Sequence, residues 1–549
     1  MISVPSIKRL AKCALSAVLA ASMLCTGVAY ADEPYTGYNY DWWNDPVPSQ
    51  NGYVPDKVVT GNDLGCGNLT QPSDMYFSAR GELYIADTAY AGADNSLKGR
   101  IVITDHTFDA ATTRAVEKLD FSEVSDFLNE EKQALDSGKI TQAQYDKETS
   151  VYFRGPTGVF VTDEDLIYVA DKENDRVIAF TYSKGADGDG VGTVKYVYTR
   201  PEANVYDSST TFNPDKVLVD AAQNVYICIK SITKGAVVYS KEGEFSGYFG
   251  ANRVEKTGEV LLNAFWKLIF TRDQIKRMKK NVPVEISNFD IDGDNFVYTV
   301  TESKSASTDV FKKLNSGGTN IFTNLGYSEY DFGDPLQKYY RGTTYSSQIT
   351  DVEISNDGTI NLLDLQTGRV FQYDDECTLL FIFGGIGTQK GTFTTVNAVE
   401  SYGTNIYVLD GRKCSITVFK QTEFGAIVHD AIELFNRGKY EEAREPWMEV
   451  LRRDSNYWLA YIGLGNAYLN EGDYATAMDY FYYNSRSGYN NAFKGWRMAF
   501  IRDNFTLFAV IILVILAAVY VLSTIRGRKR AKKRAEQDRL LKEQQKKEE

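Results

Sequence analysis

Four oxygen-bearing side chains recur at one position of a repeated segment in this chain: Asp74, Asn288, Asp351 and Asn397. In each segment, this side chain lies ten residues before a fixed position in the second apolar run of the same segment. Carboxylate and amide oxygens are the ligands that hard divalent cations prefer. If the repeated segments converge on an axis, we expect these side chains at the rim of a central channel, as a binding site that could hold a divalent cation for hydrolysis.

The sequence contains few of the residues that other kinds of catalytic site require. The chain contains only two histidines, His106 and His429, and no C-x-x-C motif. Zinc sites and Ser-His or Cys-His nucleophiles need these residue types in combination. We therefore expect the protein not to be an enzyme, and we expect no cofactor apart from the candidate divalent cation.

The elements that must position the four side chains are short strands. Gly155–Phe180 has the pattern of three strands separated by acidic turns. Five related segments begin at Gln71, Asn213, Ile286, Ile349 and Val396. Small antiparallel sheets of this kind cannot bury both faces alone, so several must stack around an axis. Six units predict a mainly β fold, a six-bladed β-propeller.

Two further features refine this prediction. The propeller is expected over residues 61–425, and residues 32–60 form an N-terminal segment that could supply a strand closing the ring against the last unit. Asp171 and Arg176 recur as Asp87 with Arg100 and as Asp364 with Arg369, and Asp410 repeats the aspartate. We expect these residues to be structural, because Asp serves tight turns and an Arg on the next strand can pair with it.

The motifs P-x-G, Y-hydrophobic-A-D and N-x-R within Pro156–Phe180 resemble an NHL repeat. Gly250, Gly384 and Gly391 resemble the connectors between NHL blades. The resemblance implies an NHL-like propeller. It also raises the alternative of a metal-dependent hydrolase resembling gluconolactonase, whose metal is held by Glu, Asn and Asp. Where that family carries its acidic residues, however, this chain offers Asp215 alone, and the histidine-rich site of an NHL-type amidating lyase is absent.

Two insertions interrupt the repeats. Residues 109–149 are charged and helix-prone with an apolar stripe, which predicts a helical hairpin packed on the rim. Residues 259–281 are also expected to be helical and packed on the propeller. Their basic amphipathic pattern leaves open a contact with a membrane surface or an acidic partner. The candidate contact residues are Trp266, Lys276, Arg277, Lys279 and Lys280.

The pattern becomes helical over residues 426–502. Gly438, Tyr440 and Ala443 reappear 34 residues later. This spacing and these residue types resemble tetratricopeptide (TPR) repeats. The resemblance implies a helical groove that binds peptide or protein segments.

The two ends of the chain predict its location. Residues 1–31 combine a basic start, an apolar stretch and an A-x-A site, which is typical of a signal peptide. Residues 505–525 form an apolar run long enough to cross a bilayer, and residues 526–549 form a basic tail. The positive-inside rule then predicts a single-pass plasma-membrane protein with its N-terminus outside and its C-terminus in the cytoplasm.

The distribution of charge along the chain limits the classes of partner that we expect. The net charge is −13 although both ends of the chain are basic, so the segment between them is strongly acidic. An acidic surface repels phosphate backbones, and nucleic acid is therefore not expected as a ligand. The basic tail is expected to attract anionic lipid.

These observations favour a membrane-anchored extracytoplasmic binding or scaffold protein. Its propeller face and TPR groove would bind other membrane or cell-envelope proteins, because neither element needs a catalytic residue. A solute- or carbohydrate-binding accessory of a membrane transporter is one alternative, and the metal-dependent hydrolase is the other.

Overall fold

The computed structural model describes residues 34–41, 45–91, 97–184, 190–203, 206, 210–230, 232–252, 283–302, 310–322, 332–334, 338–340, 343–345 and 347–548. It divides into two compact units. The first, called the β unit, contains residues 1–40 and 44–426; the second, called the helical unit, contains residues 41–43 and 427–549. Each unit is described by itself. The signal peptide predicted at residues 1–31 and the insertion predicted at 259–281 lie outside the described residues.

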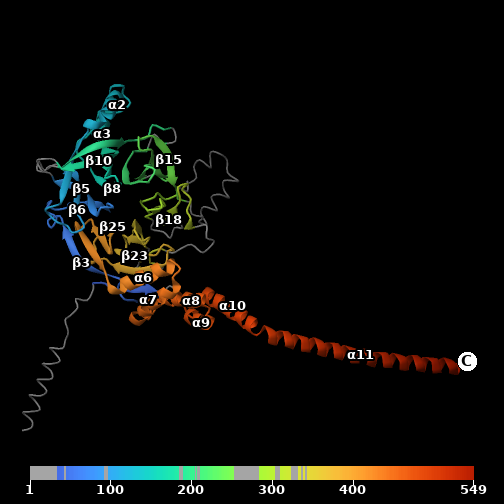
Figure 1. Cartoon of the computed structure of the whole chain (residues 1–549). Coiled ribbons are helices and arrows are strands. Elements are labelled where there is room, and N and C mark those ends of the chain that lie inside the picture. Colours follow the sequence, from blue (N-terminus) through green and yellow to red (C-terminus); the bar gives the residue numbers. More distant parts are fainter. Residues whose placement is uncertain are drawn as a thin grey trace, which may run out of the picture. The chain divides into compact units, whose positions relative to one another are not determined.

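The β unit is built from antiparallel strands that follow one another along the chain (Figure 1). The first half contains β4 (Pro72–Phe77), β5 (Glu82–Ala91), β6 (Leu97–Asp105), β7 (Arg114–Asp120), β8 (Pro156–Val161), β9 (Ile167–Asp171), β10 (Arg176–Lys184), β11 (Gly190–Tyr198), β12 (Pro214–Val219), β13 (Val225–Ile229), β14 (Gly235–Tyr239) and β15 (Phe245–Gly250). The second half contains β16 (Asn288–Ile291), β17 (Val297–Val300), β18 (Phe311–Leu314), β21 (Ile349–Ile354), β22 (Ile360–Asp364), β23 (Arg369–Tyr373), β24 (Leu379–Gly384), β25 (Val396–Tyr402), β26 (Asn405–Asp410) and β27 (Ser415–Gln421).

Neighbouring strands in sequence are neighbours in the sheets. A parallel pair, β7 with β11, joins the first two groups of four strands into one eight-stranded sheet. The strand β3 (Tyr53–Thr60) pairs antiparallel with β27, so residues from before the first repeat complete the last four-stranded sheet. Two short ribbons form separate two-stranded sheets: β1 (Tyr38–Tyr40) with β2 (Pro46–Pro48), and β19 (Lys338–Tyr340) with β20 (Thr343–Tyr345).

The first strands of the repeated segments lie against one another. In the described part of the chain they touch in the order β4, β8, β12, β16, β21, β25 and back to β4. Figure 1 shows the sheets arranged side by side around these strands. The β unit is therefore a mainly β, propeller-like fold in which the first strands face a common axis.

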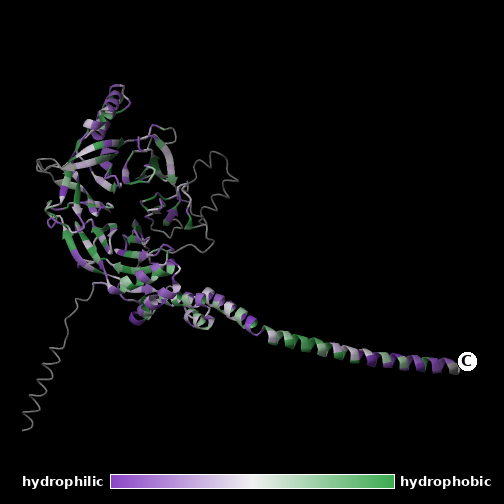
Figure 2. Ribbon diagram, in the orientation of Figure 1, coloured by the Kyte–Doolittle hydropathy of each residue, from purple (hydrophilic) through white to green (hydrophobic). Residues whose placement is uncertain are grey.

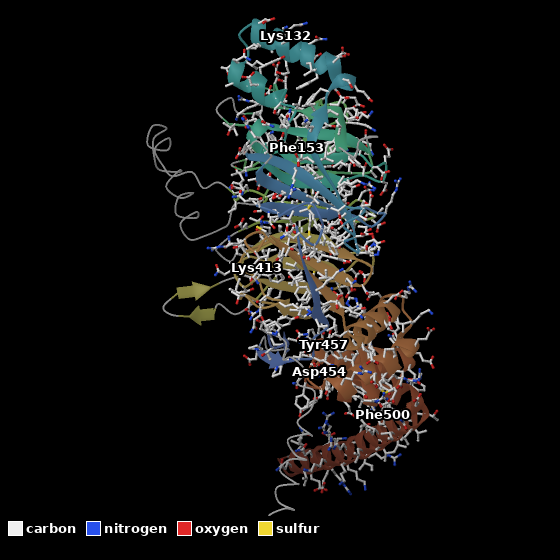
Figure 3. The ribbon with its side chains drawn as sticks, turned by 90° about the vertical axis from the view of Figure 1, so that its left-hand side faces the viewer. Lys132, Phe153, Lys413, Asp454, Tyr457 and Phe500 are labelled. Atoms are coloured by element: carbon white, nitrogen blue, oxygen red, sulfur yellow. The ribbon has the colours of Figure 1, made fainter. Side chains whose placement is uncertain are left out.

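Aromatic side chains fill the space between the sheets. The second-strand tyrosines are buried: Tyr84, Tyr168, Tyr226, Tyr298 and Tyr407. Large aromatic side chains bury much apolar area, and so they dominate the packing of such cores. Phe153, labelled in Figure 3, is also fully buried and contacts the ring of Phe180.

Two buried ion pairs fasten the first two groups of strands. Arg176 pairs with Asp171, and Arg100 pairs with Asp87, both at 3.0 Å. The expected equivalent in the fifth group is different, because Arg369 binds Asp334 at 3.4 Å. Asp364, which opposes Arg369 in the sheet, instead accepts hydrogen bonds from the backbone of residues 348 and 366.

The first insertion is helical only in part. Residues 114–120, expected in the helical hairpin, form β7, because pairing with β6 and β11 satisfies their backbone groups. The hairpin consists of the short turn η1 (Ser122–Val124), α2 (Ser125–Asp136) and α3 (Gln142–Glu148). A second short turn, η2 (Lys172–Asn174), joins β9 to β10. Thr141 and Gln144 form a capping box that starts α3.

The C-terminal part of the chain is helical. It contains α6 (Glu423–Asn436), α7 (Tyr440–Arg453), α8 (Trp458–Glu471), α9 (Tyr474–Phe481), α10 (Arg486–Asp503) and α11 (Phe505–Glu548). Asp454 and Tyr457 lie together in the turn between α7 and α8, and the Tyr457 amide donates to the Asp454 carbonyl (Figure 3).

The helix α11 is long and apolar enough to cross a membrane. Figure 2 shows that its first half is hydrophobic and its second half is polar. The apolar run predicted at residues 505–525 is thus part of one helix that continues through the basic tail.

Candidate functional site

Three of the four predicted site residues come together where the first strands meet. Asp74, Asn288 and Asp351 lie on β4, β16 and β21, and all three side chains are buried. The amide of Asn288 donates a hydrogen bond to Asp351. Lys216, on β12, donates its ammonium to Asp74 and also acts electrostatically on Asp351. We call the axis on which the first strands converge the channel, and these four residues its upper layer.

Asn397 does not belong to the upper layer. Asp74 opposes Ala86 and Asp351 opposes Leu363, whereas Ala398 is the residue that opposes Leu409 in the last sheet. The turn from β25 to β26 is one residue shorter than the corresponding turns. The ten-residue spacing therefore points to Asn397, although Ala398 holds the equivalent position. This prediction is corrected by the strand register.

The position of Asn397 gives it a different role. It lies at the irregularity between Val396 and Ala398, and its side-chain amide donates to the carbonyl of Pro72 at 2.8 Å. Ser73 makes the same kind of contact, because its hydroxyl donates to the carbonyl of Pro156 at 3.0 Å. Asn397 therefore fastens one first strand to the next.

A second layer of acidic residues was missed by the sequence analysis. Asp290 and Glu353 each lie two residues beyond an upper-layer residue, and Glu400 lies two residues beyond Ala398. Residues two apart on a strand point to the same face, so these side chains also face the channel. The period-two spacing along strands already identified was the signal that could have found them. We call Asp290, Glu353 and Glu400 the lower layer.

Four of the five channel carboxylates bind the backbone of the neighbouring first strand. Asp290 accepts from the amide of residue 354 at 2.7 Å, and Asp351 accepts from the amide of residue 399 at 2.7 Å. Glu400 accepts from the amide of residue 77 at 3.1 Å, and Asp74 accepts from the amide of residue 159 at 2.9 Å. Each link runs from one first strand to the next, so these four carboxylates stitch β16, β21, β25, β4 and β8 together.

Burial makes several of these carboxyl groups weak acids. It raises the pKa of Asp290 and of Asp351 to about 7, although the Lys216 ammonium opposes the rise at Asp351. Burial also raises the pKa of Glu353 to about 8, against hydrogen bonds from Ser401 and Asn361. The pKa of Glu400 is raised well above its ordinary value by burial and by the nearby charges of Glu353 and Asp290.

The acid expected at a gluconolactonase-like metal site has cationic partners in this structure. Within the residues that the structure describes, no group of three or more His, Cys, Asp or Glu side chains is arranged to hold a metal ion. Asp215, the one acid at the position expected from gluconolactonase-like propellers, pairs with Lys172 and lies 3.3 Å from Lys230. Burial alone would raise the pKa of Asp215, but these lysines bring it below its usual value. Its charge is already balanced.

The other predicted contact residues cannot be placed. Trp266, Lys276, Arg277, Lys279 and Lys280 lie outside the described residues, so their contact with a membrane or an acidic partner stays a prediction.

The Lys216 ammonium should stabilise the channel most when the acids around it are charged. Replacing Lys216 with methionine is expected to lower the free energy of unfolding at pH 8 by about 2–3 kcal/mol, because Asp74 and Asp351 lose their buried cation. The loss should be smaller at pH 5, where these carboxyl groups can be neutral. Urea denaturation at the two pH values measures it.

Lys230→Met is the matched control, because Lys230 also pairs with a carboxylate but is 56% exposed. Exposed pairs contribute about 0–1 kcal/mol, so this variant should unfold like the wild type. Equal losses in the two variants, or a Lys216→Met loss that does not change with pH, would contradict the role assigned to Lys216.

Comparisons with known proteins identify no family. No family model matches the chain, and no curated protein matches it. Among solved structures, virginiamycin B lyase from Staphylococcus aureus is 9% identical over 67% of this chain and 99% of its own, with a TM-score of 0.34. A putative gluconolactonase is 8% identical over 71% of this chain and 98% of its own, with a TM-score of 0.33.

PorZ, a surface component of the type-IX secretion system of Porphyromonas gingivalis, is 14% identical over 64% of this chain and 41% of its own, with a TM-score of 0.32. Similarities at this level carry no argument about activity. The function proposed below rests on this chain's own residues.

Proposed function

We propose that this chain is a membrane-anchored extracytoplasmic binding and scaffold protein, made of a six-bladed NHL-like propeller, TPR-like helices and one membrane-spanning helix. One observation carries the proposal: four of the five channel carboxylates that could serve catalysis are bound to backbone amides of neighbouring strands, and the fifth, Glu353, is bound to side chains of Ser401 and Asn361. A carboxylate that links two strands serves the fold. The surfaces that remain for function are those of loops and helices.

Six blades are supported by the order of contacts among the first strands. The described strands form six groups of three or four, and their first strands touch in a closed cycle. The strand β3, from the start of the β unit, pairs with β27 and becomes the fourth strand of the last group, as expected of a ring-closing strand.

TPR-like packing is supported by features that recur 34 residues apart. Gly438 and Gly472 both end helices in the left-handed conformation, with φ of 74° and 89°. Ala443 and Ala477, and likewise Trp447 and Phe481, are buried at matching positions. The glycines of α8 accept large neighbours, because a Cβ at Gly463 would meet the Trp447 ring at 2.4 Å.

A hollow of about 390 Å³ between α7 and α8 is the candidate binding groove. Most of its lining residues are of polar or charged types, and they include Lys439, Tyr440 and Asn470. Arg444 spans it by pairing with Glu471 at 2.9 Å and lies over the ring of Tyr468. This chemistry fits a polar, charged segment of another membrane or cell-envelope protein.

Anchoring and orientation are supported by α11 and its basic continuation. No residue of the apolar part of the helix is buried in the isolated chain, as expected for a lipid-facing helix. Arg526, Arg528, Lys529 and Arg530 follow at once, and this basic run supports a cytoplasmic C-terminus at the plasma membrane, near anionic lipid.

The scaffold role is tested by reversing the charges of the groove while keeping its ion pair. The double variant Arg444→Glu with Glu471→Arg should fold normally but lose the cross-linked partners that the wild-type chain retains when captured from its own membranes in detergent. The matched control reverses Arg453 and Glu449, another α7 ion pair at 2.8 Å, and should keep the partners. Identical cross-link patterns in all three proteins would count against the groove.

The alternatives have their own test. If titration with calcium or zinc raises the melting temperature of the wild type but not of Asp351→Ala, the hydrolase resembling gluconolactonase becomes the better proposal. A solute- or carbohydrate-binding accessory of a transporter would instead show a melting shift with sugars and no dependence on the groove.

A further inference from the structure

The helix α10 carries a row of exposed aromatic side chains that leads to the proposed membrane helix. Phe493, Trp496 and Phe500 are 43%, 41% and 47% exposed. They follow the spacing i, i+3 and i+7, which places them on one face of the helix. Phe500 is labelled in Figure 3 on the part of α10 nearest α11. A soluble helix would not gain from such a row in water.

The aromatic rings touch one another in sequence. The ring centroids of Phe493 and Trp496 are 5.9 Å apart, and those of Trp496 and Phe500 are 5.6 Å apart, both stacked. The next contact is between Phe500 and Phe508, whose centroids are 6.0 Å apart. Because Phe508 belongs to the apolar part of α11, the aromatic row is continuous with the surface that faces lipid.

Among the described residues of the helical unit, the packing contacts of α10 come from another face of the helix. The helix packs on its neighbours through small residues: Ala492 is buried, and a Cβ at Gly488 or Gly495 would meet the ring of Phe481 or Tyr474 at 2.6 Å or 2.5 Å. These contacts lie on another side of the helix. The aromatic face is therefore left for an occupant outside the unit.

The connection to α11 keeps this face close to the bilayer. Asn504 alone separates the two helices, and its amide groups bond to the carbonyl of Phe500. At 1.5 Å per residue, Phe500 and Phe493 lie about 6 Å and 17 Å along the chain from Asn504. The headgroup layer is about 5–8 Å thick on each side of a bilayer. An upright α10 would carry Phe493 beyond this layer, whereas a tilted one would place the whole row within it.

From this geometry we propose that α10 is an interfacial helix, which lies along the outer surface of the same membrane and inserts Phe493, Trp496 and Phe500 among the lipid headgroups. Trp concentrates at this depth because its ring is apolar but carries a polar N–H group, and Phe is typical of the apolar face of interfacial helices. Arg497 and Lys494 both lie on one side of the row, and their long side chains can reach lipid phosphates. The helix would hold the TPR-like groove at the membrane surface. The inference rests on the proposed anchoring by α11.

Spin labelling of the full chain in a bilayer tests this arrangement. Single cysteines are introduced as Phe493→Cys and Asn491→Cys, in a chain whose partly exposed Cys66 and Cys414 are replaced by serine. Positions 491 and 493 are nearly level along the helix but about 200° apart around it, and both are exposed, so neither change disturbs the core. The chain is reconstituted into phosphatidylcholine with a minority of phosphatidylglycerol. Collision rates with oxygen, which concentrates in lipid, and with a nickel chelate, which stays in water, are then measured.

The label at 493 should have a several-fold higher ratio of oxygen to nickel collisions than the label at 491. A third label, from Val514→Cys, reports on α11 itself. If position 514 lies in lipid but 493 and 491 are equally accessible to nickel, the interfacial helix is wrong while the anchor stands. If 514 is not in lipid, the anchor fails and the inference fails with it. A label at 493 shielded from both reagents would mean that a second copy of the chain covers the row, which also overturns the proposal.

Discussion

Replacing Asp171 with alanine is expected to lower the free energy of unfolding of the β unit by about 3–5 kcal/mol. Asp171 and Arg176 are both fully buried, and the guanidinium Nε lies 3.0 Å from the carboxylate. Alanine would leave the guanidinium charge buried without its counter-ion. Removing one partner of a buried pair is more costly than removing both.

The surroundings of the pair make relaxation difficult. The Arg176 guanidinium also donates to the carbonyls of Glu148 and Ser150, each at 2.7 Å, and so attaches the end of the α2–α3 hairpin to β10. Asp171 accepts the amide of Arg154 at 2.6 Å and the side-chain amide of Asn174 at 2.7 Å. Loss of the carboxylate therefore affects the strand, the turn and the hairpin together.

Urea denaturation of the full chain in detergent, followed by circular dichroism of the β signal, measures this loss. Asp163→Ala, at an exposed position in the turn before β9, is the control and should change the free energy by less than about 0.5 kcal/mol. The double variant Asp171→Ala with Arg176→Met should recover part of the loss. A single variant as stable as the control would show that the pair contributes nothing.

The stability of the β unit is expected to fall as the pH rises from about 4 to 8. In unfolded chains Asp and Glu titrate near pH 4, whereas burial raises the pKa of Asp290 and Asp351 to about 7 and that of Glu353 to about 8. Between these values the folded state binds more protons than the unfolded state. The contribution of these groups is therefore fully present below pH 4 and is lost as the pH passes 7 to 8.

Asp290→Asn isolates one of these groups. The asparagine oxygen can still accept the Ile354 amide, which Asp290 accepts at 2.7 Å, but it carries no charge at any pH. Each pKa unit corresponds to about 1.4 kcal/mol, so the variant should exceed the wild type by about 2–4 kcal/mol at pH 8 and match it near pH 4. Urea midpoints across this range measure the difference. Asp163→Asn is the control, and parallel curves for wild type and Asp290→Asn would contradict the raised pKa.

Two predictions from the sequence were changed by strand register and strand pairing. The ten-residue spacing selected Asn397, but a turn one residue shorter shifts the last sheet so that Ala398 takes that position. Residues 114–120 have a helix-prone composition, yet they form β7 because two strands are available to pair with them. Turn length decided the first case and strand pairing decided the second, against what the local sequence pattern predicted.

The ion-pair partners of charged side chains also could not be predicted from the local sequence. Lys216 and Asp74 are 142 residues apart in sequence, and their contact exists only because β4 and β12 meet at the axis. Arg369 was expected to pair with Asp364, but Asp334 takes this role. Long side chains can reach several acids, and only the packed structure decides which one is near.

The sequence by itself determined the features that depend on neighbours along the chain. Alternating apolar residues between acidic turns indicated the strands, a 34-residue recurrence indicated the helices, and one long apolar run indicated the helix that can cross a membrane. Period and local composition suffice for these elements because each is defined by its own backbone geometry. Only the tertiary structure decided that the channel acids bind neighbouring strands, because that depends on register across an axis. It also left the aromatic face of α10 uncovered, because small residues on another side of that helix make its packing contacts.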